Sequence, residues 1–275
     1  MNKIKAVFTD LDGTLLNDQE KLTQVNYNAL IELEKNNILR ILATGRNPYS
    51  LIKTVGEDLP VDYVIFSCGG GIYDWKKKEL IVAKNFLKSH YEEIIRMLEN
   101  ERIDYSLHFQ IPENHCFYFK KSGNLNTDFE LRIQRYGSFA YPMNGFCEIE
   151  KSCEIIAYIP DDHYTFDYLE SKFIDFDFLS IVRSTSPIDK KSIWMEFYPK
   201  NVNKGATAEW LCRFLSIEKE LTLGIGNDYN DIDLLRFTNY KVLVENSPEK
   251  IKAMAHFVSA SNNANGFAKA VNFFL

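Results

Sequence analysis

Short apolar runs that end in polar or glycine-rich turns recur in the first part of the chain, as IKAVFTDLDG, ILRILATG and DYVIFSCGGG. Such runs are typical of strands that are buried on both faces inside a parallel sheet. Between the first two, residues 24–37 have apolar positions at helical spacing. After the second, Asn47 can cap another helix that has Pro48 at its first position. Strands and helices alternating with short links predict an α/β fold with a doubly wound, Rossmann-like parallel sheet.

The pattern changes between about residues 82 and 190, where strand-like segments follow one another with tight turns. The expected order is helix-strand-strand-helix-strand-helix-strand-strand, which ends on FLSIVRST and SIWMEFYPK. Buried-strand runs then return as LTLGIG and YKVLV. We therefore predict a core domain of residues 1–81 and 191–275 with an α+β domain of residues 82–190 inserted into it.

The bulk composition narrows the class of protein. The 275 residues suit one large domain or two small ones, and 32 basic against 38 acidic residues give a net charge of −6. A nucleic-acid surface would need a clustered basic excess, so we expect no nucleic-acid partner. No apolar run reaches the length of a membrane span, and Asp10 interrupts the N-terminal apolar run too early for a signal peptide. We expect a cytoplasmic monomer or weak homo-oligomer without membrane partners.

The cysteines favour neither a disulfide framework nor a structural zinc site. They are odd in number and form no Cys-x-x-Cys pair. The five are Cys68, Cys116, Cys147, Cys153 and Cys212. Reduced, buried thiols are therefore expected.

The first apolar run ends on two carboxylates, Asp10 and Asp12. Ligands in open α/β sheets bind outside the carboxyl ends of the strands, so this is where a site is expected. Gly13 and Thr14 allow a tight turn whose backbone N–H groups can face an anion. A plain acidic turn is one alternative. A calcium loop is another, and it fails because Gly13 comes too early and Lys21 stands where a Glu is needed.

The stretches FTDLDGTL, LATGR, NKG and GNDYND, in that order, resemble the four motifs of the haloacid-dehalogenase-like phosphohydrolases. Within these the whole chain is similar to the Cof-type, sugar-phosphatase-like branch. Asp12 and Thr44 are 32 residues apart, whereas Thr44 and Lys204 are 160 apart. The extra domain therefore lies between the second and third motifs, where the resemblance implies a substrate-selecting cap.

The resemblance also implies catalytic roles. Asp10 matches the nucleophile that forms an aspartyl-phosphate, and Asp12 matches the general acid and base. Thr44 matches the hydroxyl that binds a phosphoryl oxygen. Lys204 matches the lysine that neutralises the phosphate and orients Asp10. Further contacts to the phosphate are expected from Leu11, Gly13, Gly45, Arg46 and Asn230.

The implied cofactor is Mg²⁺, held by Asp10, by the backbone carbonyl of Asp12 and by the fourth motif. The family usually has a carboxylate where this chain has Asn227, whose amide offers only a neutral oxygen. We expect Asp228 to complete the charge with Asn227 close by. Asp231 would hold Lys204 or a metal-bound water.

The sequence identifies the residues that contact the substrate less clearly. The third strand ends in CGGG, where this branch usually has Asn-Gly-Ala, and Gly69 is interpreted as standing in place of the Asn. The implied function is Mg²⁺-dependent hydrolysis of a small phosphorylated metabolite, with a sugar phosphate as the expected substrate. Phosphotransfer between sugars, as in a mutase, is an alternative. A binding protein without turnover is another, for which the missing carboxylate at Asn227 is the main support.

Overall fold

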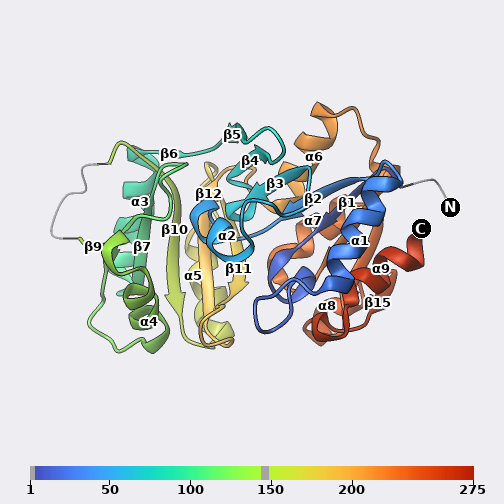
Figure 1. Cartoon of the computed structure of the whole chain (residues 1–275). Coiled ribbons are helices and arrows are strands. Elements are labelled where there is room, and N and C mark those ends of the chain that lie inside the picture. Colours follow the sequence, from blue (N-terminus) through green and yellow to red (C-terminus); the bar gives the residue numbers. More distant parts are fainter. Residues whose placement is uncertain (1–3, 144–148) are drawn as a thin grey trace. The chain divides into compact units, whose positions relative to one another are not determined.

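The computed structural model describes residues 4–143 and 149–275, which form two compact units (Figure 1). The first unit is Met1–Val82 with Asn203–Leu275, and the second is Ala83–Val202. Cys147 lies outside the described residues, and the other four cysteines are free thiols.

The first unit is built on an eight-stranded sheet in the order β15-β14-β13-β1-β2-β3-β4-β5. Every pairing from β15 to β3 is parallel, and β4 is antiparallel to β3. The strands are β1 (Ala6–Thr9), β2 (Leu39–Ala43), β3 (Tyr63–Phe66), β4 (Gly71–Asp74), β5 (Glu79–Ala83), β13 (Thr222–Gly226), β14 (Tyr240–Val244) and β15 (Phe257–Ser259).

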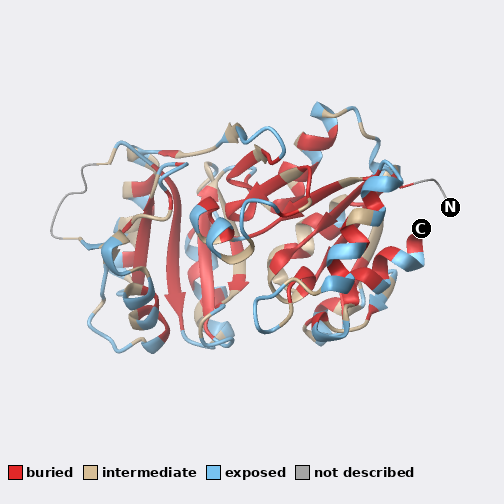
Figure 2. Ribbon diagram, in the orientation of Figure 1, coloured by how far each residue is buried: buried red, intermediate tan, exposed pale blue. Residues whose placement is uncertain are grey.

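Helices lie between the parallel strands along the chain or follow the last of them, and they are buried on the side that faces the sheet (Figure 2). They are α1 (Gln24–Lys35), α2 (Pro48–Val55), α6 (Lys204–Phe214), α7 (Ile232–Phe237), α8 (Glu249–Lys252) and α9 (Gly266–Phe274). Leu211 of α6 joins Phe8 of β1 and Ile41 of β2 in one buried cluster. All four residues of β1 are buried, as expected for a strand with cover on both faces. The predicted doubly wound α/β fold is confirmed.

The strand order decides where the polar turns lie. Strands β13, β1 and β2 are neighbours and parallel, so their carboxyl ends share one edge of the sheet. The loops that start at Asn227, Asp10 and Thr44 leave these three strands side by side. Three of the four motifs therefore meet through sheet topology alone.

The second unit has a largely antiparallel sheet in the order β11-β12-β10-β7-β8-β9, with β6 paired to β10. Its strands are β6 (Phe86–Leu87), β7 (Asp104–Phe109), β8 (Phe117–Lys120), β9 (Ala140–Pro142), β10 (Lys151–Ile159), β11 (Leu179–Thr185) and β12 (Ile193–Pro199). Its helices are α3 (Lys88–Asn100), α4 (Thr127–Tyr136) and α5 (His163–Lys172). An α+β insert with the predicted order of main elements is thus present.

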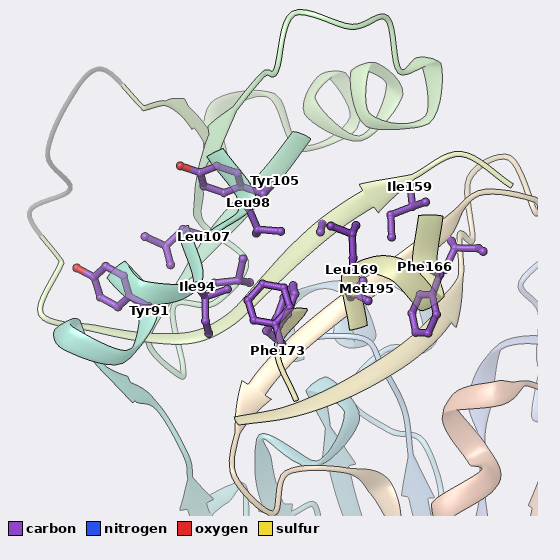
Figure 3. Close-up of a cluster of buried hydrophobic side chains, with 14 of the residues drawn as sticks. Tyr91, Ile94, Leu98, Tyr105, Leu107, Ile159, Phe166, Leu169, Phe173 and Met195 are labelled. Carbon is purple, nitrogen blue, oxygen red and sulfur yellow. The ribbon is translucent and has the colours of Figure 1, made fainter. Parts of the chain in front are cut away.

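Aromatic and aliphatic side chains from α3, α5 and the central strands form the core of this second unit (Figure 3). Ile94 of α3, Leu169 of α5 and Met195 of β12 belong to it. Since β12 pairs with β10 and β11, it belongs to the inserted unit. The insert therefore extends to Val202, beyond residue 190 where the sequence pattern places its end.

None of the helices in the part of the chain that the structure describes combines the length and the apolar character that a membrane crossing requires.

Candidate active site

A buried lysine joins the first and fourth motifs in the first unit. Lys204 Nζ lies 2.6 Å from Asp10 Oδ1 and 2.6 Å from Asp231 Oδ1, and its side chain has no exposed surface. It is the first residue of α6, and the preceding Asn203 caps that helix by accepting a hydrogen bond from the N–H of Ala206 (2.7 Å). The cap fixes the direction in which the lysine leaves the helix.

The charges around Lys204 do not balance, because one ammonium group faces two buried carboxylates. Burial, together with the charge of Asp231, raises the pKa of Asp10 to about 7, although Lys204 opposes this. Burial alone would lower the pKa of Lys204, but Asp10 and Asp231 raise it above its usual value, so the ammonium stays charged. The excess negative charge at Asp10 is the electrostatic condition that a bound cation would relieve.

The side-chain amide of Asn227 reaches back to the first motif. One end of this amide lies 3.0 Å from Thr14 Oγ1, 3.1 Å from Asp10 Oδ2 and 3.0 Å from the carbonyl oxygen of Asp12. An amide nitrogen at that end donates hydrogen bonds to these oxygens. An amide oxygen there would face the Asp10 and Asp12 oxygens directly, and such a group of oxygens needs a cation between them. Gly13, at φ +75°, leaves room for the amide, since a Cβ there would lie 2.6 Å from Asn227 Nδ2.

These oxygens fit a magnesium ion. Adjacent ligands of an octahedral Mg²⁺ at about 2.0–2.1 Å lie about 3 Å from one another. The amide of Asn227 has this separation from both Asp10 Oδ2 and the Asp12 carbonyl oxygen. In residues 4–143 and 149–275 no group of three or more His, Cys, Asp or Glu side chains is placed to hold a metal. A set of one carboxylate, one carbonyl and one amide suits an ion that keeps several of its waters.

Asp228 and Asp231 are occupied by the turn that follows β13. The side chain of Asp228 accepts a hydrogen bond from the backbone N–H of Asp231, forming one half of a capping box. Asp231 Oδ2 in turn accepts from the N–H groups of Asn227 (2.8 Å) and Asp228 (3.1 Å). From the sequence, Asp228 is expected to complete the metal charge. The structure instead uses its carboxylate to shape the loop and places Asn227 against Asp10 and Asp12.

The carboxylate of Asp12 is held by Arg46. Arg46 Nε and Nη2 donate to Asp12 Oδ2 and Oδ1, each at 2.7 Å. From the sequence, Arg46 is expected to contact the phosphate, and the structure places it on the carboxylate of Asp12, the predicted acid and base. Glu20, Ser50 and Thr54 hold the rest of the guanidinium, and no motif pattern singles out these three residues.

Other predicted phosphate contacts surround the same strand ends. The hydroxyl of Thr44 accepts from the N–H of Arg46 (3.0 Å), which leaves the hydroxyl proton available for a phosphoryl oxygen. Asn230 Oδ1 lies 3.5 Å from Lys204 Nζ. Leu11 is buried and starts a π-type turn, so only its backbone can serve a ligand. A Cβ at Gly45 would lie 3.3 Å from the thiol of Cys68.

The glycine loop after β3 packs against the start of α6. Gly69 has φ +108°, and a Cβ there would lie 2.5 Å from the carbonyl oxygen of Asn203. The backbone at the cap of α6 therefore leaves no room for a side chain at this position. The side chain that this loop turns toward the site is Cys68, whose sulfur lies 3.9 Å from Asn230 Nδ2. The sequence analysis passes over this thiol because nothing in its neighbourhood resembles a reactive motif.

Comparison with known proteins agrees with this geometry. A family model described as haloacid dehalogenase-like hydrolase matches residues 7–271. Phosphatase YwpJ of Bacillus subtilis is 23% identical over 286 residues, which cover 96% of this chain and 98% of that protein. BT1666 of Bacteroides thetaiotaomicron, described among the phosphatases of the superfamily, has a similar solved structure, with a TM-score of 0.80 and 19% identity over 99% of this chain and 95% of that chain. The subclass IIB sugar phosphatase BT4131 has a TM-score of 0.75 and 20% identity over 98% of both chains.

Proposed function

Because the chain belongs to the haloacid dehalogenase-like hydrolases, we propose that it is a Mg²⁺-dependent phosphomonoesterase that hydrolyses a sugar phosphate or similar small metabolite through an aspartyl-phosphate on Asp10. The family expected from the four motifs is confirmed by the match over residues 7–271. An enzyme of the phosphatase class agrees with that family and with the name of the Bacillus subtilis relative. The sugar phosphate is supported by a structural relative that is described as a sugar phosphatase.

The observation that carries the proposal is the placement of Asp10. One of its oxygens lies 2.6 Å from the Lys204 ammonium, and the other lies 3.1 Å from the Asn227 amide, next to the Asp12 carbonyl. A carboxylate between a buried cation and a cluster of oxygens that fits Mg²⁺ can approach a phosphate dianion without unscreened repulsion. Charge neutralisation and positioning are the main requirements of phosphoryl transfer.

The residues support a balanced two-step reaction. An oxygen of Asp10 forms a bond to phosphorus while the bond from phosphorus to the leaving alcohol breaks. Asp12 gives its proton to that alcohol oxygen. In the second step the Asp12 carboxylate takes a proton from the water that attacks the same phosphorus. The Asp10–phosphorus bond then breaks and inorganic phosphate leaves.

Magnesium, when bound, would neutralise charge on the phosphoryl oxygens. Asp10, the Asp12 carbonyl and Asn227 are the groups that would hold it, with Asp228 left in its capping role. This reverses the order of preference that the sequence gives for Asn227 and Asp228. It also weakens the case for a protein without turnover, because the Asn227 amide can turn its oxygen toward Asp10 Oδ2 and the Asp12 carbonyl oxygen when the ion binds.

Asn227→Asp and Asp228→Asn test that ligand assignment. Asn227→Asp should tighten Mg²⁺ binding about tenfold, because it adds a charged ligand. It should also lower the stability of the metal-free protein, because the new carboxylate faces Asp10. Asp228→Asn should change the Mg²⁺ affinity less than about threefold, since Asn also caps helices. Calorimetric Mg²⁺ titrations measure these affinities. A large loss of Mg²⁺ affinity in Asp228→Asn, together with unchanged affinity in Asn227→Ala, would contradict the assignment.

Magnesium affinity should also depend on pH through Asp10. With its pKa at about 7, Asp10 is mostly protonated at pH 6, and the ion must displace that proton. The dissociation constant for Mg²⁺ should therefore fall about tenfold from pH 6 to pH 8 and change little above that. Titrations at several pH values measure this. Asp10→Asn is the matched control and should bind Mg²⁺ weakly with little pH dependence. The same change of the dissociation constant with pH in both proteins would contradict the explanation.

A turnover screen tests the function itself. Phosphate release is followed with Mg²⁺ over panels of sugar phosphates, nucleotides and phosphorylated cofactors. We expect release from at least one sugar phosphate. A rearranged sugar phosphate in place of free phosphate would identify a mutase. Tight binding by calorimetry with no release at high protein concentration would identify a binding protein, and either result would overturn the proposal.

The role of the unit Ala83–Val202 as a substrate-selecting cap is also part of the proposal. Its support is the position of the insert between the second and third motifs. Closing caps exclude water from phosphoryl-transfer sites and choose among substrates.

A further inference from the structure

We propose that Arg46 is a positioning residue for Asp12, fixing the carboxylate that exchanges protons with the substrate, and that it does not bind the phosphate. This inference rests on the proposed phosphatase function. It assigns to Arg46 a role that the sequence motif does not suggest, and it follows from the number of hydrogen-bond donors and acceptors around the guanidinium.

All three nitrogens of the Arg46 guanidinium are engaged in the structure, through four hydrogen bonds and one further ion pair. Nε donates to Asp12 Oδ2, and Nη2 donates to Asp12 Oδ1, both at 2.7 Å. Nη2 also forms an ion pair with Glu20 Oε1 at 3.2 Å. Nη1 donates to Ser50 Oγ at 3.3 Å and to Thr54 Oγ1 at 2.5 Å. A phosphoryl oxygen would have to compete with these contacts for the guanidinium.

The acceptors are themselves fixed, so the guanidinium has one orientation. Ser50 and Thr54 lie on α2, and the Thr54 hydroxyl gives its own proton to the Ser50 carbonyl oxygen (3.0 Å). Its lone pairs are therefore turned toward Arg46. Glu20 supplies a second negative charge beside Asp12, which keeps the guanidinium ionised. A residue held at its far side in this way can act as a rigid support.

A two-point contact fixes the carboxylate of Asp12 more tightly than a single hydrogen bond would. Two parallel N–H···O bonds prevent rotation of the carboxylate plane about its last side-chain bond. A carboxylate has about four lone-pair sites, so those not used by Arg46 remain for a proton. The Asp12 side chain is 39% exposed, so these sites can reach a substrate.

The role predicts an effect that depends on the leaving group. A sugar alkoxide leaves only with protonation, whereas p-nitrophenolate is a stable anion and needs little help from an acid. Loss of the Arg46 contact to Asp12 should therefore slow hydrolysis of the sugar phosphate and leave hydrolysis of p-nitrophenyl phosphate nearly unchanged. A phosphate-binding arginine would affect both substrates alike, because both carry the same phosphate.

The experiment compares kcat/KM for a sugar phosphate found active in the screen with kcat/KM for p-nitrophenyl phosphate, in wild type and in Arg46→Met. We expect a loss of about a hundredfold with the sugar phosphate and of less than about threefold with p-nitrophenyl phosphate. Arg46→Lys keeps the charge without the two-pronged contact and should show the same selective loss. Arg213→Met changes an arginine of α6 whose side chain is 71% exposed, and it serves as the matched control, with kcat/KM near wild type for both substrates.

A double mutant separates positioning from folding. In an Asp12→Asn background, adding Arg46→Met should cause no further selective loss of kcat/KM for the sugar phosphate. A general structural defect would instead lower kcat/KM for both substrates again. Equal losses for both substrates together with weaker inhibition by inorganic phosphate would overturn the proposal in favour of phosphate binding. A faster reaction in Arg46→Met would overturn it, because Arg46 would then be holding Asp12 in an inactive position. Absence of turnover in wild type would remove the proposed function and this inference together.

Discussion

Replacing Asp10 with asparagine is expected to lower the rate of phosphate release roughly 10⁴-fold or more, the scale seen when a covalent nucleophile is removed. An amide cannot form the bond to phosphorus that starts the reaction. The fold should survive, because the substitution leaves the Lys204 ammonium with one buried carboxylate, Asp231, in place of two. The measurement is a phosphate-release assay beside thermal unfolding.

The metal-free Asp10→Asn protein should be at least as stable as wild type at pH 8. The raised pKa of Asp10 means that ionising it in the folded state costs free energy, and wild type loses this stability as pH rises from about 4 to about 7. Asp58→Asn is the matched control, since Asp58 is exposed and should change neither rate nor stability. Unchanged phosphate release in Asp10→Asn would rule out the aspartyl-phosphate pathway.

Replacing Lys204 with methionine should be the most damaging single change to the fold of the first unit. It leaves the carboxylates of Asp10 and Asp231 buried side by side without a cation. Breaking a buried charge cluster by removing one partner costs about 3–5 kcal/mol of folding free energy. Phosphate release should be lost as well, because no ammonium remains beside the phosphate. Denaturant unfolding at pH 8 without metal measures the first effect.

The loss of folding free energy caused by Lys204→Met should become smaller as pH falls. Without the ammonium, Asp10 and Asp231 can become neutral by binding protons, and lower pH makes this easier. Lys250→Met is the control, since Lys250 is exposed on α8. If Lys204→Met unfolded like wild type at pH 8, the buried lysine would not be holding the two carboxylates together.

The fold could be read from the sequence because its strands are buried on both faces. A strand such as β1 must be apolar throughout, and this run is visible without alignment. The C-terminal limit of the insert could not be read in the same way. The last strand of the insert, β12, has six buried residues in succession and resembles a core strand. The predicted order of elements already ends on this strand, SIWMEFYPK, so the limit at residue 190 falls before it, and its pairing with β10 and β11 places it in the second unit.

The site was predictable where a motif carries its own chemistry. Asp10, Lys204 and Asp231 come together as their motifs suggest. The choice between Asn227 and Asp228 could not be read, because neighbouring residues in a turn point in different directions and the capping box decides which one faces Asp10. The role of Arg46 depends on contacts to side chains on other segments, and sequence spacing carries no information about such contacts.

The most direct test of the central claim is to trap the phosphorylated enzyme. The protein is mixed with Mg²⁺ and an active substrate, quenched in acid within milliseconds, digested and analysed by mass spectrometry. The account predicts a transient peptide that contains Asp10 and carries one added phosphoryl group, and its absence from Asp10→Asn. Full turnover with no phosphoryl group on Asp10 at any quench time, or with the group on another residue, would contradict it.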